Sequence, residues 1–153
     1  MLILHTSSAG ELHPVTGLRH SVLPKVVMPV NPTSLLYVGN SFFFFNNGVH
    51  RLVNRLLKSM PVKPKYRGTL VAINGAALSW HDLASYFRPR GLAAYSINAE
   101  NEIVFRDPQE KLWDAVLMCD CSQGPIHSVL AKDFAEAAKK DSEICRSHGA
   151  VPI

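Results

Sequence analysis

Three short apolar segments, each followed by a small polar turn, constrain the fold of this 153-residue chain most strongly. The segments cover residues 34–38, 69–73 and 113–119, and the turns cover 39–41, 74–75 and 120–123. Apolar runs of this length between turn residues are typical of fully buried parallel strands. Because helical patterns separate the runs, the sequence predicts an α/β domain with a mostly parallel sheet.

Two helices are predicted from apolar residues at helical spacing. The first covers residues 47–60 and ends at Pro61, and the second covers 126–148 with Gly149 as its C-terminal cap. The first has an apolar stripe of Val49, Leu52, Val53, Leu56, Leu57 and Met60. The second is expected to bury Val129, Leu130, Phe134, Ala137, Ala138, Ile144 and Cys145. A short helix is expected over 80–87, and a hairpin over 93–96 and 102–105.

The prolines and the lack of a clear period in residues 1–33 predict an irregular N-terminal extension, followed by one domain over 34–153. The chain ends in Ala-Val-Pro-Ile directly after a helix cap, which resembles the start of a further strand. We therefore expect the domain to be incomplete at its C-terminus. A missing strand would expose a sheet edge, which favours a homo-oligomer.

Composition excludes several classes of protein. The net charge is +4, but the densest basic stretch, residues 58–67, is broken by prolines and has the character of a solvated loop, so we expect no nucleic-acid partner. No apolar run is long enough to span a membrane and no basic-flanked leader opens the chain, so a cytoplasmic protein is expected. Three cysteines predict reduced thiols, since the pair in Cys119-Asp120-Cys121 lacks the second pair that a zinc site needs. We expect no metal and no cofactor.

The turns after the three strands should meet at one edge of the sheet, because the carboxyl ends of parallel strands share an edge. Gly39-Asn40-Ser41 is good turn chemistry, and it is also a position for a nucleophilic serine. Such a serine needs a base and donors for the oxyanion. Ser41 offers its own N–H, Gly75 a backbone that can approach closely, and Ser122 or Gln123 a third donor.

The histidines offer few candidates for the base. His81 and His127 each follow a core strand and lie near the correct edge, although ordinary loop or cap roles are the commoner outcome. His50 is expected on the outer face of its helix, and His148 at the opposite edge. The positions of His5, His13 and His20 are not predicted. Some members of the aromatic run Phe42-Phe43-Phe44-Phe45 are expected to fill the core under the loop, with one or two of them walling an acyl or sugar pocket as the alternative. Trp80 and Trp113 are expected to serve as core and strand-edge packing.

The segment LLYVGNSFFFFNNGVHRLV resembles the first block of the SGNH (GDSL-type) hydrolases, in which Gly-Asp/Asn-Ser follows the first strand. LVAINGAALSWH is similar to the second block of that family, and WDAVLMCDCSQGPI to its third strand and loop. The resemblance covers roughly residues 34–153. It implies a three-layer α/β/α, flavodoxin-like fold and hydrolysis of small-molecule or carbohydrate esters. It also implies Ser41 as nucleophile, with the Ser41 N–H, Gly75 and Ser122 as oxyanion donors.

The chain differs from that family because it lacks the sequence block that supplies the catalytic base. The family's Asp-x-x-His block, which supplies the histidine, occurs nowhere in the 153 residues. The third block differs too, because Cys119 and Cys121 flank Asp120 where the family has Asn or Gln-rich sequence. We therefore expect a fragment or a degenerate copy with little activity unless His81, His127 or a partner supplies a base. The alternative is a non-catalytic module that binds an anion or a carbohydrate acid at the N-terminus of the helix after Asn46, which has Gly39 and Ser41 ahead of it.

Overall fold

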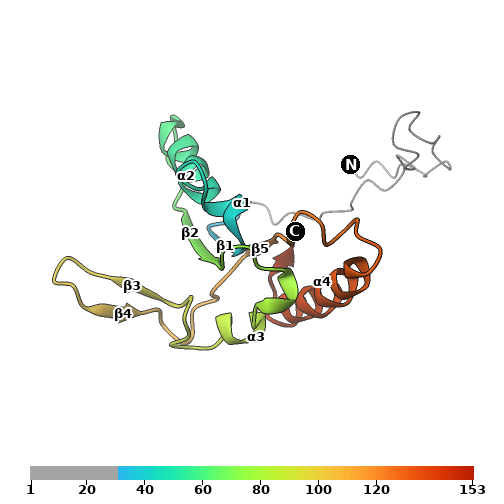
Figure 1. Ribbon diagram of the computed structural model, residues 1–153. Coiled ribbons are helices and arrows are strands. Elements are labelled where there is room, and N and C mark those ends of the chain that lie inside the picture. The colour runs from blue at the N-terminus through green and yellow to red at the C-terminus, as the bar shows by residue number, and fades with distance from the viewer. Residues whose placement is uncertain (1–30) are drawn as a thin grey trace, which may run out of the picture.

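The computed structural model describes residues 31–153, so the predicted irregular extension lies outside the described residues apart from 31–33. The main sheet consists of four parallel strands in the order β2-β1-β5-β6 (Figure 1). The strands are β1 (Ser34–Gly39), β2 (Arg67–Ala72), β5 (Ala115–Met118) and β6 (Val151–Pro152). This arrangement confirms the predicted α/β class with a mostly parallel sheet.

Strand β1 is one of the two inner strands of the sheet, and all six of its residues are buried. It pairs with β2 on one side and β5 on the other, so its backbone groups are satisfied along both edges. Neighbouring residues point to opposite faces of the sheet. Leu36 and Val38 therefore join one apolar cluster, and Leu35 and Tyr37 join another.

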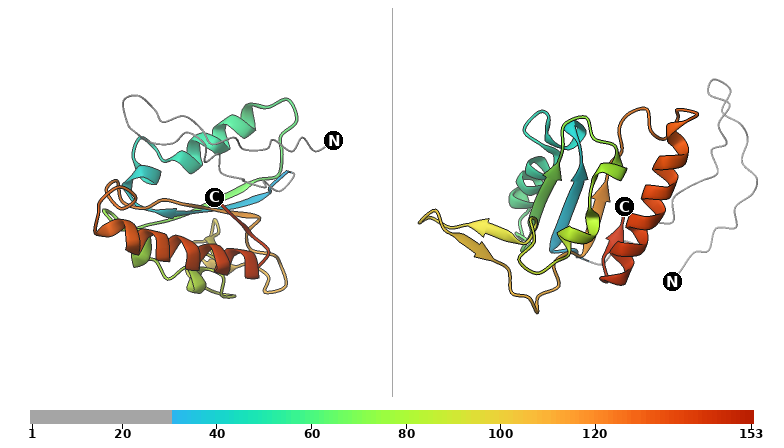
Figure 2. Two further views of the ribbon diagram at one scale, coloured as in Figure 1. Left: turned by 90° about the vertical axis from the view of Figure 1, so that its right-hand side faces the viewer. Right: turned by 60° about the horizontal axis from the view of Figure 1, so that its bottom comes forward.

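Helices lie on both faces of this sheet: α2 (Val49–Ser59) on one face and α4 (Leu130–Ser147) on the opposite one (Figure 2). Val49 of α2 packs against the cluster that contains Leu35 and Tyr37. Cys145 of α4 belongs to the cluster that contains Leu36 and Val38. The two clusters form the core above and below the sheet.

The apolar stripe predicted for the first helix is only half buried. Val49, Val53 and Leu57 are half-buried, and they occupy one row along the helix. Leu52 and Leu56 flank that row and are 46% and 68% exposed. Among the described residues, the rest of the protein therefore covers the middle row of apolar side chains on this helix and leaves the flanking ones exposed to solvent.

The C-terminal helix confirms the prediction for Ala137 and Cys145, which are both buried. The prediction was wrong for Val129 and Leu130, which are 69% and 36% exposed. The reason is that residues 122–129 form turns rather than helix, so the helix begins only at Leu130.

The two tryptophans have opposite environments. Trp113 is fully buried, as predicted, and its indole N–H donates to the Tyr86 carbonyl. Trp80 is 65% exposed, so its predicted core position was wrong. It ends the 3-10 helix η1 (Leu78–Trp80), in which Leu78 and not Trp80 faces the core. The expected short helix is present as α3 (Leu83–Tyr86).

The predicted hairpin is confirmed as a separate antiparallel pair, β3 (Tyr95–Ile97) and β4 (Ile103–Phe105). It projects from the main sheet as an arm (Figure 1). Among the helices of residues 31–153, none has both the length and the apolar character needed to cross a membrane.

Candidate functional site

The side chain of Asn40 holds the three strand-end turns together. Asn40 directly follows β1 and is 2% exposed. Its amide nitrogen donates to the Ala76 carbonyl at 2.9 Å and to the Asp120 carbonyl at 3.1 Å. These two acceptors belong to the turns after β2 and β5. The predicted meeting of the three turns at one edge of the sheet is therefore confirmed.

Asn40 also caps the helix that carries the candidate nucleophile. Its side-chain oxygen accepts from the Phe42 N–H at 3.1 Å, and Ser41 is the first residue of the short helix α1 (Ser41–Phe44). The N–H of a first helical residue has no partner within its helix. Ser41 is partly exposed. The hydroxyl-bearing residue thus lies at the rim of the sheet rather than in its core.

The turn before Ser41 is tightly packed. A Cβ on Gly39 would lie 3.0 Å from the Cβ and carbonyl oxygen of Cys119 and 3.0 Å from the Phe43 ring. Phe43 in turn packs edge-on against Tyr37, with ring centroids 5.6 Å apart. Phe43 is therefore the member of the aromatic run that fills the space under the turn. Phe42 and Phe45 are 55% and 64% exposed, and the prediction that some members of the run fill the core is confirmed for Phe43.

Asp120 ties the third turn to the second. Its carboxylate oxygen Oδ1 accepts from the Leu78 N–H at 2.6 Å. Gly124 packs directly on this carboxylate, because a Cβ there would lie 1.6 Å from Asp120 Oδ2. Asp120 fixes the backbone of the two turns, and its carboxylate is an acceptor that cannot stabilise an oxyanion.

Gly75 and Ser122, the two predicted oxyanion donors, lie on the turns that Asn40 joins to Ser41. Gly75 has a φ of +71°, a conformation that favours glycine, and no atom lies within 4 Å of where its Cβ would be. Its backbone is therefore open to a bound molecule. Ser122 is exposed in the turn after β5. Their roles as donors to an oxyanion stay predictions.

His81 is a structural residue of this edge. It is 4% exposed, and its Nε2 lies 2.9 Å from the Gly39 carbonyl oxygen while its Nδ1 lies 3.0 Å from the Tyr86 hydroxyl. A carbonyl only accepts, so Nε2 carries the proton. Burial lowers the pKa of His81, which favours the neutral ring with Nδ1 accepting from Tyr86. Both ring nitrogens are thus occupied, and neither is available to Ser41.

The other histidines of the described chain do not supply a base to Ser41 either. His127 is exposed, and its Nδ1 accepts from the Val129 N–H. His50 is half-buried near Tyr37 rather than on the outer surface as expected. None of the histidines of residues 31–153 forms a hydrogen bond with Ser41.

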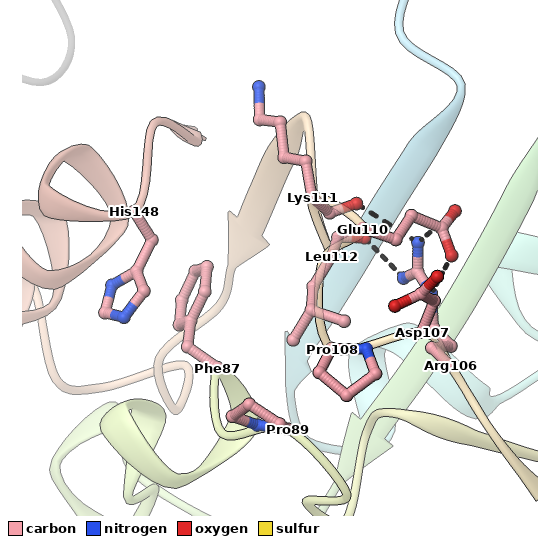
Figure 3. A pocket seen from close by; sticks show the side chains of 9 residues that line it. All are labelled: Phe87, Pro89, Arg106, Asp107, Pro108, Glu110, Lys111, Leu112 and His148. Atoms are coloured by element: carbon pink, nitrogen blue, oxygen red, sulfur yellow. Dashed lines mark hydrogen bonds and ion pairs between the residues drawn. The ribbon is translucent and has the colours of Figure 1, made fainter.

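His148 lies at the opposite edge of the sheet, as predicted. It stacks on Phe87, with ring centroids 4.4 Å apart, beside a hollow whose lining includes Lys111 and Leu112 (Figure 3). These two residues precede β5, so the hollow lies near the amino end of that strand. Arg106 in this hollow already bonds Glu110 and the Leu112 carbonyl. The hollow is unrelated to the turns around Ser41.

Comparison of the chain with models of known protein families, with curated proteins and with solved structures found no match. The site is therefore described by its own chemistry. It consists of a partly exposed serine at a helix start, an open glycine turn and a second exposed serine. Among residues 31–153, no group of three histidine, cysteine or acidic side chains is placed to hold a metal ion.

Sequence reasoning missed two residues that build this edge. Asn40 was considered only as part of a turn, although an asparagine at the end of a fully buried strand must find partners for a buried amide. For His81 the sequence suggests a base or an ordinary loop or cap role, but it does not give the partners of the ring. Its actual partner, the Gly39 carbonyl, lies 42 residues away along the chain, and no spacing rule connects the two.

Proposed function

We propose that this chain is a serine ester hydrolase domain of the SGNH type, with the three-layer α/β/α, flavodoxin-like architecture of that family. Ser41 is the nucleophile. The Ser41 N–H, the Gly75 backbone and the Ser122 hydroxyl stabilise the oxyanion. The substrate is a small-molecule or carbohydrate ester.

The observation that carries this proposal is the set of hydrogen bonds made by Asn40. They draw the turns that hold Gly75 and Ser122 towards the turn that holds Ser41. The openness of the backbone at Gly75 adds support, because an acyl oxygen needs room to approach a donor there. The parallel order β2-β1-β5-β6 with helices on both faces supports the proposed architecture.

The proposed reaction is acyl transfer through a covalent intermediate. The Ser41 hydroxyl oxygen attacks the ester carbonyl carbon, and its proton must pass to a base. The alcohol leaves with a proton, and water then hydrolyses the acyl-serine. Because no histidine of residues 31–153 forms a hydrogen bond with Ser41, we propose that the proton transfer lacks an intramolecular base there, and we expect slow turnover.

Imidazole in solution is expected to restore part of the missing proton transfer. With p-nitrophenyl acetate as substrate, added imidazole should raise the protein-dependent rate by about tenfold or more, because a positioned or freely diffusing base assists the attack. Ser41→Ala should abolish the increase beyond the reaction of imidazole alone. Ser122→Ala should reduce it by about tenfold as an oxyanion donor is lost. The release of p-nitrophenol measures each rate.

Ser96→Ala, an exposed serine on the hairpin, is the matched control and should behave like the parent chain. Equal protein-dependent rates for the parent chain and Ser41→Ala at every imidazole concentration would remove Ser41 from the chemistry.

A module that binds an anion or a carbohydrate acid without catalysis is the alternative. This alternative uses the start of α2, the helix after Asn46, where the Arg51 and Leu52 N–H groups already donate to the Gly48 carbonyl. We favour the hydrolase because the hydrogen bonds of Asn40 join the turns that hold Ser41, Gly75 and Ser122.

A further inference from the structure

A hollow of about 300 Å³ lies between the segment of η1 and helix α4, on the opposite face of the sheet from α2. Its lining residues are Ser79, His81, Asp133, Glu136, Ala137, Lys140 and Asp141. It contains three carboxylates and one ammonium group, so it carries a net negative charge. It is separate from the rim that holds Ser41, although His81 belongs to the wall of the hollow and bonds the turn before Ser41.

Asp141 is the residue of this hollow that needs an explanation. It is 2% exposed, yet its carboxylate forms no hydrogen bond and no ion pair with any of residues 31–153. A buried carboxylate is costly unless it is paired or hydrogen-bonded. An unpaired one that lines a hollow is positioned to accept hydrogen bonds from a molecule inside it.

The side chains near Asp141 do not donate a hydrogen bond to its carboxylate. His81 uses Nε2 to donate to Gly39 and Nδ1 to accept from Tyr86, so its ring has no proton left for the carboxylate. Lys140 lies beside Asp141 in the sequence and is exposed, without an ion pair to it. Cys145, one helical turn further on, is buried, and burial raises the pKa of its thiol to about 12. A thiol is a weak donor.

The surrounding charges favour a cation. Asp133 and Glu136 line the same hollow, and Glu136 has only a long ion pair, 3.9 Å from Lys132, between exposed side chains. Such a surface pair contributes little. Burial raises the pKa of Asp141 to about 6, although the Lys140 charge acts to lower it, and Asp82 raises it further. Burial therefore makes the ionised carboxylate less favourable in free energy, and a cation bound beside it would offset that effect.

We propose that this hollow binds a small organic cation with N–H donors, a primary ammonium or a guanidinium group, which donates to the carboxylate of Asp141. A donor of this kind fits better than a metal ion, because the acidic and histidine side chains of residues 31–153 form no group of three placed for metal coordination. The inference does not depend on Ser41 being a nucleophile.

The test is a titration of the isotope-labelled 153-residue protein with agmatine and with putrescine at constant ionic strength, followed by nuclear magnetic resonance. Amide signals of residues around the hollow, Asp141 and His81 among them, should shift with saturation below about 20 mM ligand. Asp141→Asn should weaken binding by about tenfold or more, because it keeps the shape but removes the charge. Glu143→Gln, the same change at an exposed position of α4, should leave the affinity within about twofold.

The pH dependence gives a second measurement on the unaltered protein. The groups that face Asp141 are His81, Asp82 and Tyr86 from one side, and Asp133, Glu136, Lys140 and Cys145 from its own helix. Because Asp141 loses its proton near pH 6, the cation should bind more tightly at about pH 8 than at about pH 5. Equal affinity in Asp141→Asn, or no saturable shift in the folded parent protein at about pH 8, would overturn the proposal.

Discussion

Replacing Asn40 with alanine is expected to lower the free energy of unfolding by about 3 kcal/mol. The substitution removes a buried side chain that forms three hydrogen bonds, to the Ala76 carbonyl, the Asp120 carbonyl and the Phe42 N–H. It leaves the buried Ala76 carbonyl and the partly buried Asp120 carbonyl and Phe42 N–H without these partners, and it creates a small cavity. Urea denaturation followed by circular dichroism measures the change.

Asn98→Ala is the matched control for this prediction. Asn98 also uses both ends of its amide, to the side chain and the N–H of Glu102, but these bonds lie in the exposed hairpin. Its loss should cost less than about 1 kcal/mol, since water replaces the partners. Similar costs for the two substitutions would mean that Asn40 does not join the three turns.

Gly124→Ala is expected to lower the free energy of unfolding by about 2–3 kcal/mol. The new Cβ would lie 1.6 Å from Asp120 Oδ2, so the carboxylate must move. Moving it breaks the hydrogen bond from Leu78, which is 2.6 Å long and joins the second turn to the third. Urea denaturation again measures the loss.

A double-mutant cycle with Asp120→Ala tests this mechanism directly. Once the carboxylate is gone, the added methyl group at position 124 meets no obstacle from it, and Gly124→Ala should then cost less than about 1 kcal/mol. The two effects should therefore be strongly non-additive. Additive costs would show that Gly124 acts through some contact other than Asp120.

The sequence was sufficient for the order of the main strands and the two long helices, and for the meeting of the turns. Buried apolar runs alternating with helical patterns allow few topologies, and a parallel sheet places all of its carboxyl ends at one edge. This is why Asn40, Ala76 and Asp120 come together as expected. The hairpin was found because its strands flank residues typical of a turn.

What the sequence did not predict depends on contacts between distant residues. Trp80 is a large apolar residue of the kind usually found in a core. In the 3-10 helix that contains it, however, the side chain of Leu78 is buried and that of Trp80 is exposed. The bonds of His81 to Gly39 and Tyr86 decide that its ring is neutral and occupied, and they exist only in the folded chain. The local sequence pattern shows that such residues are present at a turn, but it does not show which distant residues they contact.

The most direct measurement of the central claim is the position of the acyl group after reaction with p-nitrophenyl acetate and imidazole. Without an intramolecular base the acyl-serine should be hydrolysed slowly, so it accumulates and can be located by peptide mass spectrometry after an acid quench. We expect an acetyl group on Ser41 in the folded chain, and its absence from Ser41 when the chain is unfolded in urea. An unmodified Ser41 in the folded chain, with acetyl groups elsewhere, would contradict the account.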